Sequence, residues 1–237
     1  MNKDCLRQQL AQTYHELWQT PLTPLRAPLF ANAAKAAENL RRLPAYQMAR
    51  NLAITSEPAL LQARINALLD GKNLLVATPG LKQGLVRLTA QSIPIARRHI
   101  DLQAGAMFKA GKPLPLPRAR LGKVDMLIST ALAVDENGVC LGDGRGMLDL
   151  FCAILTQQDS LEAKAPLVLL LHEKQMLPSL PQDSWDVKAQ LVLTAEAAFH
   201  YPAAPRLPLD PSLLTPVQLK LPIIKAITKT GNGRAGF

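Results

Sequence analysis

Glycine occupies every second position over residues 142–146, and this loop restricts the possible folds of the chain more than any other feature. An apolar, β-branched run of strand length at residues 124–130 precedes it, followed by a turn composition at 135–138. Residues 147–157 then have helical spacing. Because glycine lacks Cβ, successive backbone N–H groups in such a loop can face one concavity at the positive end of the next helix. The pattern predicts an α/β unit and favours a phosphate site, although a plain glycine-rich turn has the same spacing.

Two charged side chains of this region have the chemistry of phosphate binding. Arg145, inside the loop, offers a planar cationic fork, and Asp149, one turn into the helix, can hold a magnesium ion that bridges phosphates. The alternative is a surface arginine and a helix-start aspartate that is favoured by the helix dipole. The residue types alone leave both interpretations open.

The block 135–149 resembles the signature of the 5-formyltetrahydrofolate cyclo-ligase family, the methenyltetrahydrofolate synthetases. In that family a turn precedes Arg-Leu-Gly-x-Gly-x-Gly-Tyr-Tyr-Asp-Arg, and here the matching positions hold Leu141, Gly142, Gly144, Gly146 and Asp149. The resemblance implies that the loop binds ATP and that the aspartate binds Mg²⁺. The ATP-binding set then includes every residue of the loop, Gly142, Asp143, Gly144, Arg145 and Gly146.

The same signature differs from the family at its last positions. Met147 and Leu148 replace the two tyrosines, and Leu150 replaces the final arginine. The resemblance implies that Met147 and Leu148 contact the folate, as an apolar floor in place of the tyrosine rings. It also implies catalytic roles for Arg145 and Asp149.

Matches outside the glycine block are shorter. Lys3-Asp-Cys-Leu-Arg7 resembles the start of the family's chains, which implies that Lys3 and Arg7 reach the ATP phosphates; the alternative is a solvated pair on an amphipathic helix. Glu57 stands where the family places an acid toward the pterin, but it equally suits a helix start. Residues 108–113 resemble a segment found at this place in a subgroup of the family that has a long linker.

The order of apolar runs predicts one α/β domain with a mostly parallel sheet and helices on both faces, the three-layer arrangement that the resemblance also implies. We expect this domain over residues 1–202. Residues 81–123 are predicted to form a long irregular excursion, either a lid or binding loop or a disordered insertion. If the family's reaction applies, we expect Lys109, Lys112 or Arg118 to meet the glutamate tail of the folate. Residues 203–237 are predicted to be a proline-rich, basic, mobile tail. Expected helices are 4–19, 31–43, 56–71 and 147–157, and expected strands are 51–55, 73–78, 124–130, 167–172 and 190–194.

Composition adds limits on location and partners. No apolar run reaches the roughly 18 residues of a membrane span, and no secretory signal is visible, so we expect a cytoplasmic protein without a membrane partner. The net charge of +9 suits nucleotide phosphates or a folate. It permits nucleic acid, but the basic residues lack aromatic interleaving and nucleic acid is not favoured. The oligomeric state is left open between monomer and homodimer.

The resemblance implies an ATP- and Mg²⁺-dependent ligase that converts 5-formyltetrahydrofolate to 5,10-methenyltetrahydrofolate. The alternative is a catalytically degenerate relative that binds a nucleotide, a folate or RNA in a regulatory role.

Overall fold

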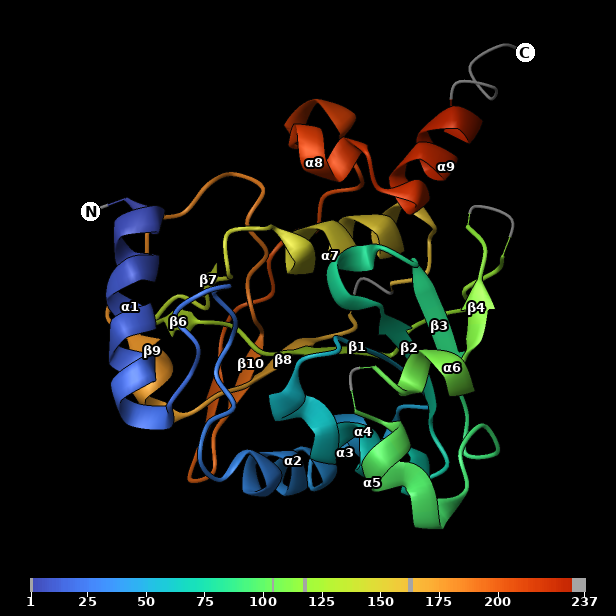
Figure 1. Ribbon diagram of the computed structural model, residues 1–237, viewed down its shortest axis with the longest axis horizontal. Helices are drawn as coiled ribbons and strands as arrows, with labels where there is room; N and C mark the ends of the chain where they lie inside the picture. Colours follow the sequence, from blue (N-terminus) through green and yellow to red (C-terminus); the bar gives the residue numbers. More distant parts are fainter. Residues whose placement is uncertain (1, 104, 117–118, 162–163, 232–237) are drawn as a thin grey trace.

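An eight-stranded mixed sheet forms the centre of the computed structural model (Figure 1), which describes residues 2–103, 105–116, 119–161 and 164–231. The strand order is β11-β10-β8-β5-β1-β2-β3-β4. The five central strands are parallel, whereas β11 at one edge and β3 and β4 at the other pair antiparallel to their neighbours. The predicted α/β class with a mostly parallel sheet is therefore confirmed. The strands are β1 Asn51–Ile54, β2 Asn73–Ala77, β3 Leu85–Leu88, β4 Lys112–Leu114, β5 Met126–Ser129, β8 Leu167–Leu170, β10 Leu191–Leu193 and β11 Ala198–His200.

Helices cover both faces of this sheet. The helices of the described residues are α1 Lys3–Trp18, α2 Ala33–Arg41, α3 Pro44–Met48, α4 Leu61–Leu69, α5 Arg98–Asp101, α6 Met107–Ala110, α7 Met147–Gln157, α8 Pro216–Leu219 and α9 Pro222–Gly231. Of these, α1 packs on a second, smaller sheet. Short 3₁₀ turns lie at η1 Pro58–Leu60, η2 Pro79–Leu81, η3 Ile95–Arg97, η4 Glu173–Gln175 and η5 Pro211–Leu213.

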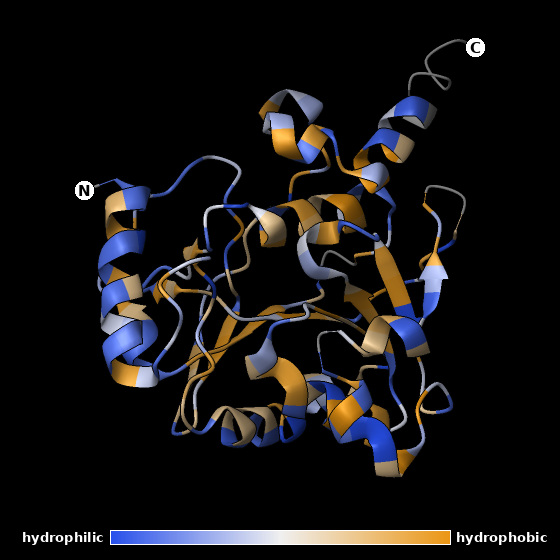
Figure 2. Ribbon diagram, viewed as in Figure 1, coloured by the Kyte–Doolittle hydropathy of each residue, from blue (hydrophilic) through white to orange (hydrophobic). Residues whose placement is uncertain are grey.

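Alternate side chains of the strands build two separate cores. In β1, Leu52 and Ile54 pack with α2, α3 and α4, while Ala53 faces the opposite core with α7 and α9. Because both faces of the sheet are buried, these strands are continuous apolar runs in the sequence. Figure 2 shows the central strands coloured as hydrophobic. The three-layer arrangement is visible in Figure 1, with α2, α3 and α4 on one side and α7, α8 and α9 on the other.

A small second sheet carries α1 and leads into the glycine loop. It pairs β7 Cys140–Leu141, β6 Ala133–Asp135 and β9 Met176–Leu177 in that order. Helix α1 buries Leu6, Leu10 and Tyr14 against it, and the Tyr14 hydroxyl donates to the Leu132 carbonyl at 2.6 Å. This packing holds the amino-terminal turn of α1 beside the loop that follows β7.

The expectation of an irregular excursion over residues 81–123 is wrong for much of its described part. That part contains β3, β4, α5 and α6. Strand β3 pairs antiparallel with β2, with Val76 opposite Val86, and β4 adds at the edge with Pro113 opposite Val86. An edge strand tolerates proline because one side of its backbone has no ladder partner, so the alternating prolines did not exclude a strand.

The expected mobile tail also differs from the structure. Residues 216–231 contain α8 and α9, and the isoleucines of α9 enter the same core as α7. Ile223, Ile224 and Ile227 are buried, whereas Lys225 is exposed. Pro216 and Pro222 each occupy the first position of a helix, where proline is favoured, so they begin α8 and α9 and do not exclude them. Residues 232–237 lie outside the described part of the chain.

Shortening a buried side chain of α9 at its contact with the α7 core tests whether α9 belongs to the folded core. Because Ile224 is 1% exposed, Ile224→Ala is expected to lower the free energy of unfolding by about 2–4 kcal/mol. The exposed neighbour change Lys225→Ala is expected to stay within about 0.5 kcal/mol of the unmodified protein. Urea denaturation measures both, and an unchanged midpoint for Ile224→Ala would contradict the packing.

Candidate functional site

The glycine loop connects β7 to α7, and its backbone requires glycine at two positions. Gly144 has φ 89° and Gly146, the N-cap of α7, has φ 61°, both in the left-handed region. Asp143 and Arg145 interact with each other: the Arg145 N–H donates to Asp143 Oδ1 at 3.1 Å, and Arg145 Nε donates to Oδ2 at 2.8 Å. This hydrogen bonding raises the pKa of Arg145. One N–H of the predicted concavity is thus used inside the loop.

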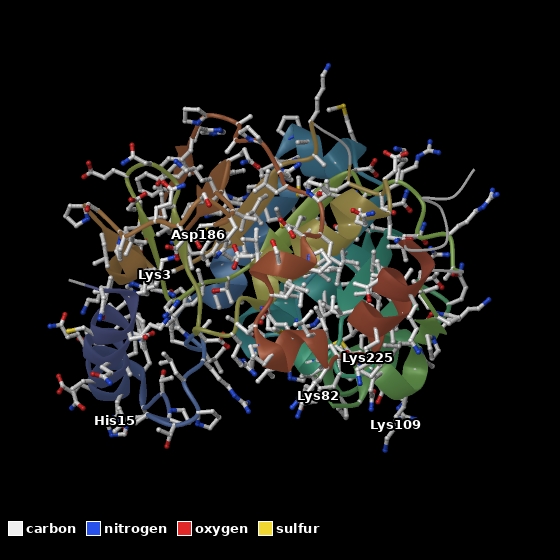
Figure 3. All side chains as sticks on the ribbon, turned by 90° about the horizontal axis from the view of Figure 1, so that it is seen from above. Lys3, His15, Lys82, Lys109, Asp186 and Lys225 are labelled. Carbon is white, nitrogen blue, oxygen red and sulfur yellow. The ribbon has the colours of Figure 1, made fainter. Side chains whose placement is uncertain are left out.

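Helix α1 brings two cations to this loop. Arg7 Nε donates to the Gly142 carbonyl at 2.9 Å, and its Cζ lies 3.5 Å from where a Cβ on Gly144 would stand. Lys3 Nζ contacts the carboxylates of Asp183 at 2.6 Å and Asp186 at 2.5 Å, and Figure 3 shows Lys3 and Asp186 side by side. Burial lowers the pKa of Lys3, but these two hydrogen bonds outweigh it and the pKa is raised.

The larger of two cavities at the loop has a volume of about 570 Å³ and opens between α1, the loop and the carboxyl-terminal segment. Its charged lining comprises three cations and five carboxylates: Lys3, Arg7, Arg145, Asp4, Asp149, Asp183, Asp186 and Asp210. Gly144 and Gly146 line it as well. A polyanion in this cavity would therefore need additional positive charge.

The smaller cavity, about 180 Å³, lies where β1, β2 and β5 end. This is the edge at which open parallel sheets bind ligands. Glu57, Thr130, Met147 and Leu148 line it. Glu57 Oε2 and Thr130 Oγ1 are buried there, and among the described residues neither atom has a hydrogen-bond partner. Since buried polar atoms are normally paired, both are positioned for a ligand that supplies the missing hydrogen bonds.

A buried arginine holds the turn that carries Glu57. Arg64 is 0% exposed, and its Nη1 donates to the carbonyls of Thr55 and Glu57, each at 3.1 Å. Burial lowers the pKa of Arg64 to about 10, against an opposing effect of the Glu57 charge. Arg64 is a positioning residue for the Glu57 turn.

Asp149 lines both cavities. Arg145 and Gly146 line both of them as well. Asp149 Oδ1 accepts from the Val187 N–H at 3.0 Å, and burial raises the pKa of this carboxyl. The loop and its aspartate can therefore contact two ligands at once.

The predicted residues divide between the cavities. Lys3, Arg7 and Gly144 line the larger one, while Gly142, Asp143, Glu57, Met147 and Leu148 line the smaller one. Neither lining includes Lys109 or Lys112, and Figure 3 shows Lys109 at the opposite end of the view from Lys3. Arg118 lies outside the described residues.

Three functional candidates escaped sequence reasoning: Arg64, Thr130 and Gln218. Gln218 is 8% exposed and donates from Nε2 to the Arg145 carbonyl at 2.9 Å. No local pattern marks any of the three, because two of them act on backbone carbonyls and the third is an ordinary hydroxyl at the end of a strand.

Within the described ranges, no helix is long and apolar enough to cross a membrane.

Comparisons with known proteins identify relatives of this chain. The chain is 30% identical over 173 residues to the methenyltetrahydrofolate synthase domain-containing protein of Bos taurus, which covers 71% of this chain and 45% of that protein. The corresponding Homo sapiens protein is 23% identical over 171 residues, with 71% and 45% coverage. The chain thus spans less than half the length of these relatives.

Two solved structures share the fold. The NMR structure of the Aquifex aeolicus 5,10-methenyltetrahydrofolate synthetase has a TM-score of 0.55 at 19% identity, covering 90% of this chain and 100% of that one. The 5,10-methenyltetrahydrofolate synthetase from Mycoplasma pneumoniae has a TM-score of 0.51 at 12% identity, covering 83% and 100%. Residues 1–195, which include α1, the glycine loop and the five parallel strands, match the model of one family. The chain belongs to the 5-formyltetrahydrofolate cyclo-ligase family.

Proposed function

We propose that the protein catalyses the ATP- and Mg²⁺-dependent conversion of 5-formyltetrahydrofolate, or a closely related folate, to its 5,10-methenyl form. The reaction implied by the family has two steps. The formyl oxygen attacks the γ-phosphorus of ATP and ADP leaves. N10 then attacks the activated carbon, its proton is released to solvent, and inorganic phosphate leaves. A protein that supports this sequence must hold two ligands with their reacting atoms adjacent.

The observation that carries the proposal is that Arg145, Gly146 and Asp149 line both cavities. The larger cavity has the volume for a nucleotide, and its three cations would bind the phosphates together with a metal ion that adds positive charge. The smaller one offers the unpartnered carboxylate oxygen of Glu57 to an N–H donor of the pterin ring. Transfer between ligands in the two cavities would take place beside the guanidinium of Arg145.

The residues present fit Mg²⁺ bound together with a nucleotide. The described residues contain no group of three or more side chains that could hold a metal ion by themselves. Mg²⁺ commonly uses one or two carboxylates together with substrate phosphates, and Asp149 supplies such a carboxylate. When bound, the metal would neutralise phosphate charge, which the acid-rich lining of the larger cavity requires.

The chain's own residues would do three things in this reaction. Arg7, which lies 3.5 Å from the Cβ position of Gly144, and Arg145, which lines the same cavity, would bind the phosphates. Lys3 would exchange one of its carboxylate partners, Asp183 or Asp186, for a phosphate oxygen. Glu57, oriented by Arg64, would fix the second ligand. This is catalysis by positioning and charge neutralisation.

A second candidate function is favoured by the changed positions of the signature. Met147, Leu148 and Leu150 lack the ring hydroxyls and the guanidinium that the family has there. A protein that binds a nucleotide, a folate or RNA without turnover, in a regulatory role, is consistent with this loss.

A turnover assay separates the two candidates. The purified chain is expected to form the methenyl product, followed by its absorbance, only when ATP and Mg²⁺ are both present. Glu57→Gln is expected to raise the KM for the folate about tenfold, because the ring would lose a charged acceptor, while Mg²⁺-ATP affinity stays unchanged. The exposed Glu136→Gln is the matched control. Absence of turnover with retained Mg²⁺-ATP binding would favour the non-catalytic role.

A further inference from the structure

A segment beyond the matched family region closes one side of the larger cavity. Residues 207–218, here called the carboxyl-terminal strap, follow residues 1–195 and line the cavity through Leu207, Leu213 and Gln218 among others. Gln218 fastens the strap: its Nε2 donates to the Arg145 carbonyl at 2.9 Å, and its Oε1 accepts from the Thr215 N–H at 2.9 Å. The strap is therefore attached directly to the glycine loop.

Exposed apolar side chains converge on the same cavity from two parts of the chain. Trp185 is 45% exposed, Leu207 49% and Leu213 44%, and all three line it. Large apolar side chains left open toward one concave site indicate a ligand surface more than they indicate a core. A tryptophan ring in particular offers a flat face for stacking.

Apolar and charged linings meet within this single cavity. Trp185 is adjacent in sequence to Asp186, which pairs with Lys3, and Arg7 and Arg145 complete the cationic part. A ligand that combines a flat ring with a phosphate chain matches both linings. At about 570 Å³ the cavity also falls within the usual range for ligands of nucleotide size.

We propose that Trp185 and the carboxyl-terminal strap, through Leu207 and Leu213, form the subsite for the base of the bound nucleotide. The inference rests on the proposed function, because it takes the phosphates to lie at the glycine loop. It assigns a ligand-binding role to residues that follow the matched family region, and to the tryptophan beside Asp186.

The test compares a nucleotide with its phosphate chain alone. Binding of Mg²⁺-ATP and of Mg²⁺-tripolyphosphate is measured by calorimetry for the unmodified chain, Trp185→Ala, Trp185→Phe and Val217→Ala. Val217 is the matched control, since it is an exposed apolar residue of the same strap, 76% exposed, that does not line the cavity. Thermal melting verifies that each variant is folded.

Trp185→Ala is expected to weaken Mg²⁺-ATP about tenfold or more, from the loss of base stacking, and to leave Mg²⁺-tripolyphosphate within about twofold. Trp185→Phe should retain most of the affinity, and Val217→Ala all of it. Nucleotide binding should also quench tryptophan fluorescence in the unmodified chain but not in Trp185→Phe, where Trp18 is the remaining tryptophan.

The other outcomes would overturn the base subsite. If Trp185→Ala binds both ligands as the unmodified chain does, or weakens both equally, the ring does not contact the base, while the phosphate site still stands. The same conclusion follows if the unmodified chain binds Mg²⁺-ATP no more tightly than Mg²⁺-tripolyphosphate. If the unmodified chain binds neither ligand, the proposed phosphate site and the base subsite both fall.

Discussion

Gly144→Val is expected to reduce Mg²⁺-ATP affinity by up to about a hundredfold, because forcing extra methyl groups into a packed contact costs up to about 3 kcal/mol. Gly144 has φ 89°, and a Cβ there would already contact the Arg7 guanidinium at 3.5 Å. The two γ-methyl groups of valine would extend further into the space between Arg7 and the loop. They would displace either the arginine or the phosphates. Calorimetric titration of Mg²⁺-ATP measures the loss.

The control for Gly144→Val must separate backbone strain from occlusion. Gly71 has φ 71° with no atom within 4 Å of a Cβ, and it lines neither cavity, so Gly71→Val carries the same kind of strain. Both variants should lose about 1–3 kcal/mol of stability. Only Gly144→Val should lose binding. If Gly144→Val binds Mg²⁺-ATP as tightly as the unmodified chain, the glycine loop is not part of the phosphate site.

Asp149→Asn is expected to lower Mg²⁺-dependent turnover about a hundredfold or more while making the folded chain more stable at neutral pH. The first effect follows from the loss of the carboxylate that fits the metal. The second follows from the raised pKa of this group, whose main cause is burial. An asparagine keeps an acceptor for the Val187 N–H but removes the buried charge.

The pH dependence of that stability change has a definite sign. A carboxyl with a raised pKa in the folded state costs stability when both states are ionised, and costs none below its unfolded pKa. The gain from Asp149→Asn should therefore be absent below the ordinary value of 3.8, grow as the pH rises toward the raised folded pKa, and be complete above that folded pKa. Denaturant unfolding at several pH values measures it.

The exposed Asp159→Asn provides the matched control for both readouts, since its side chain is 93% exposed. It should change neither turnover nor stability appreciably. Normal turnover by Asp149→Asn at limiting Mg²⁺ would show that the aspartate is not a metal ligand.

The parts of the fold that could be predicted are those encoded by local pattern. Strands such as β1 and β8 are buried on both faces and read as apolar runs, and α7 begins and ends where its spacing predicts. Strand β3 and helix α9 escaped prediction for a different reason. Their evidence lies in partners far along the chain, and prolines nearby gave an opposing local signal.

The candidate site divides in the same way. The glycine loop, Lys3 and Arg7 could be named from short motifs, but the separation into two cavities could not. That separation depends on how α1, β5 and residues 207–218 pack together. Arg64 and Gln218 were invisible because their partners are backbone carbonyls, which every residue carries.

The attachments of the glycine loop have a consequence for the order of folding. Arg7 reaches Gly142 across 135 positions, Gln218 reaches Arg145 across 73, and Lys3 reaches Asp186 across 183. Contacts so distant along the chain require large loops to close, and they form late and slowly. During synthesis the sheet and α7 can assemble before Gln218 has left the ribosome. We therefore expect ligand binding to be acquired at the last stage of folding, and to be the first property lost on mild denaturation.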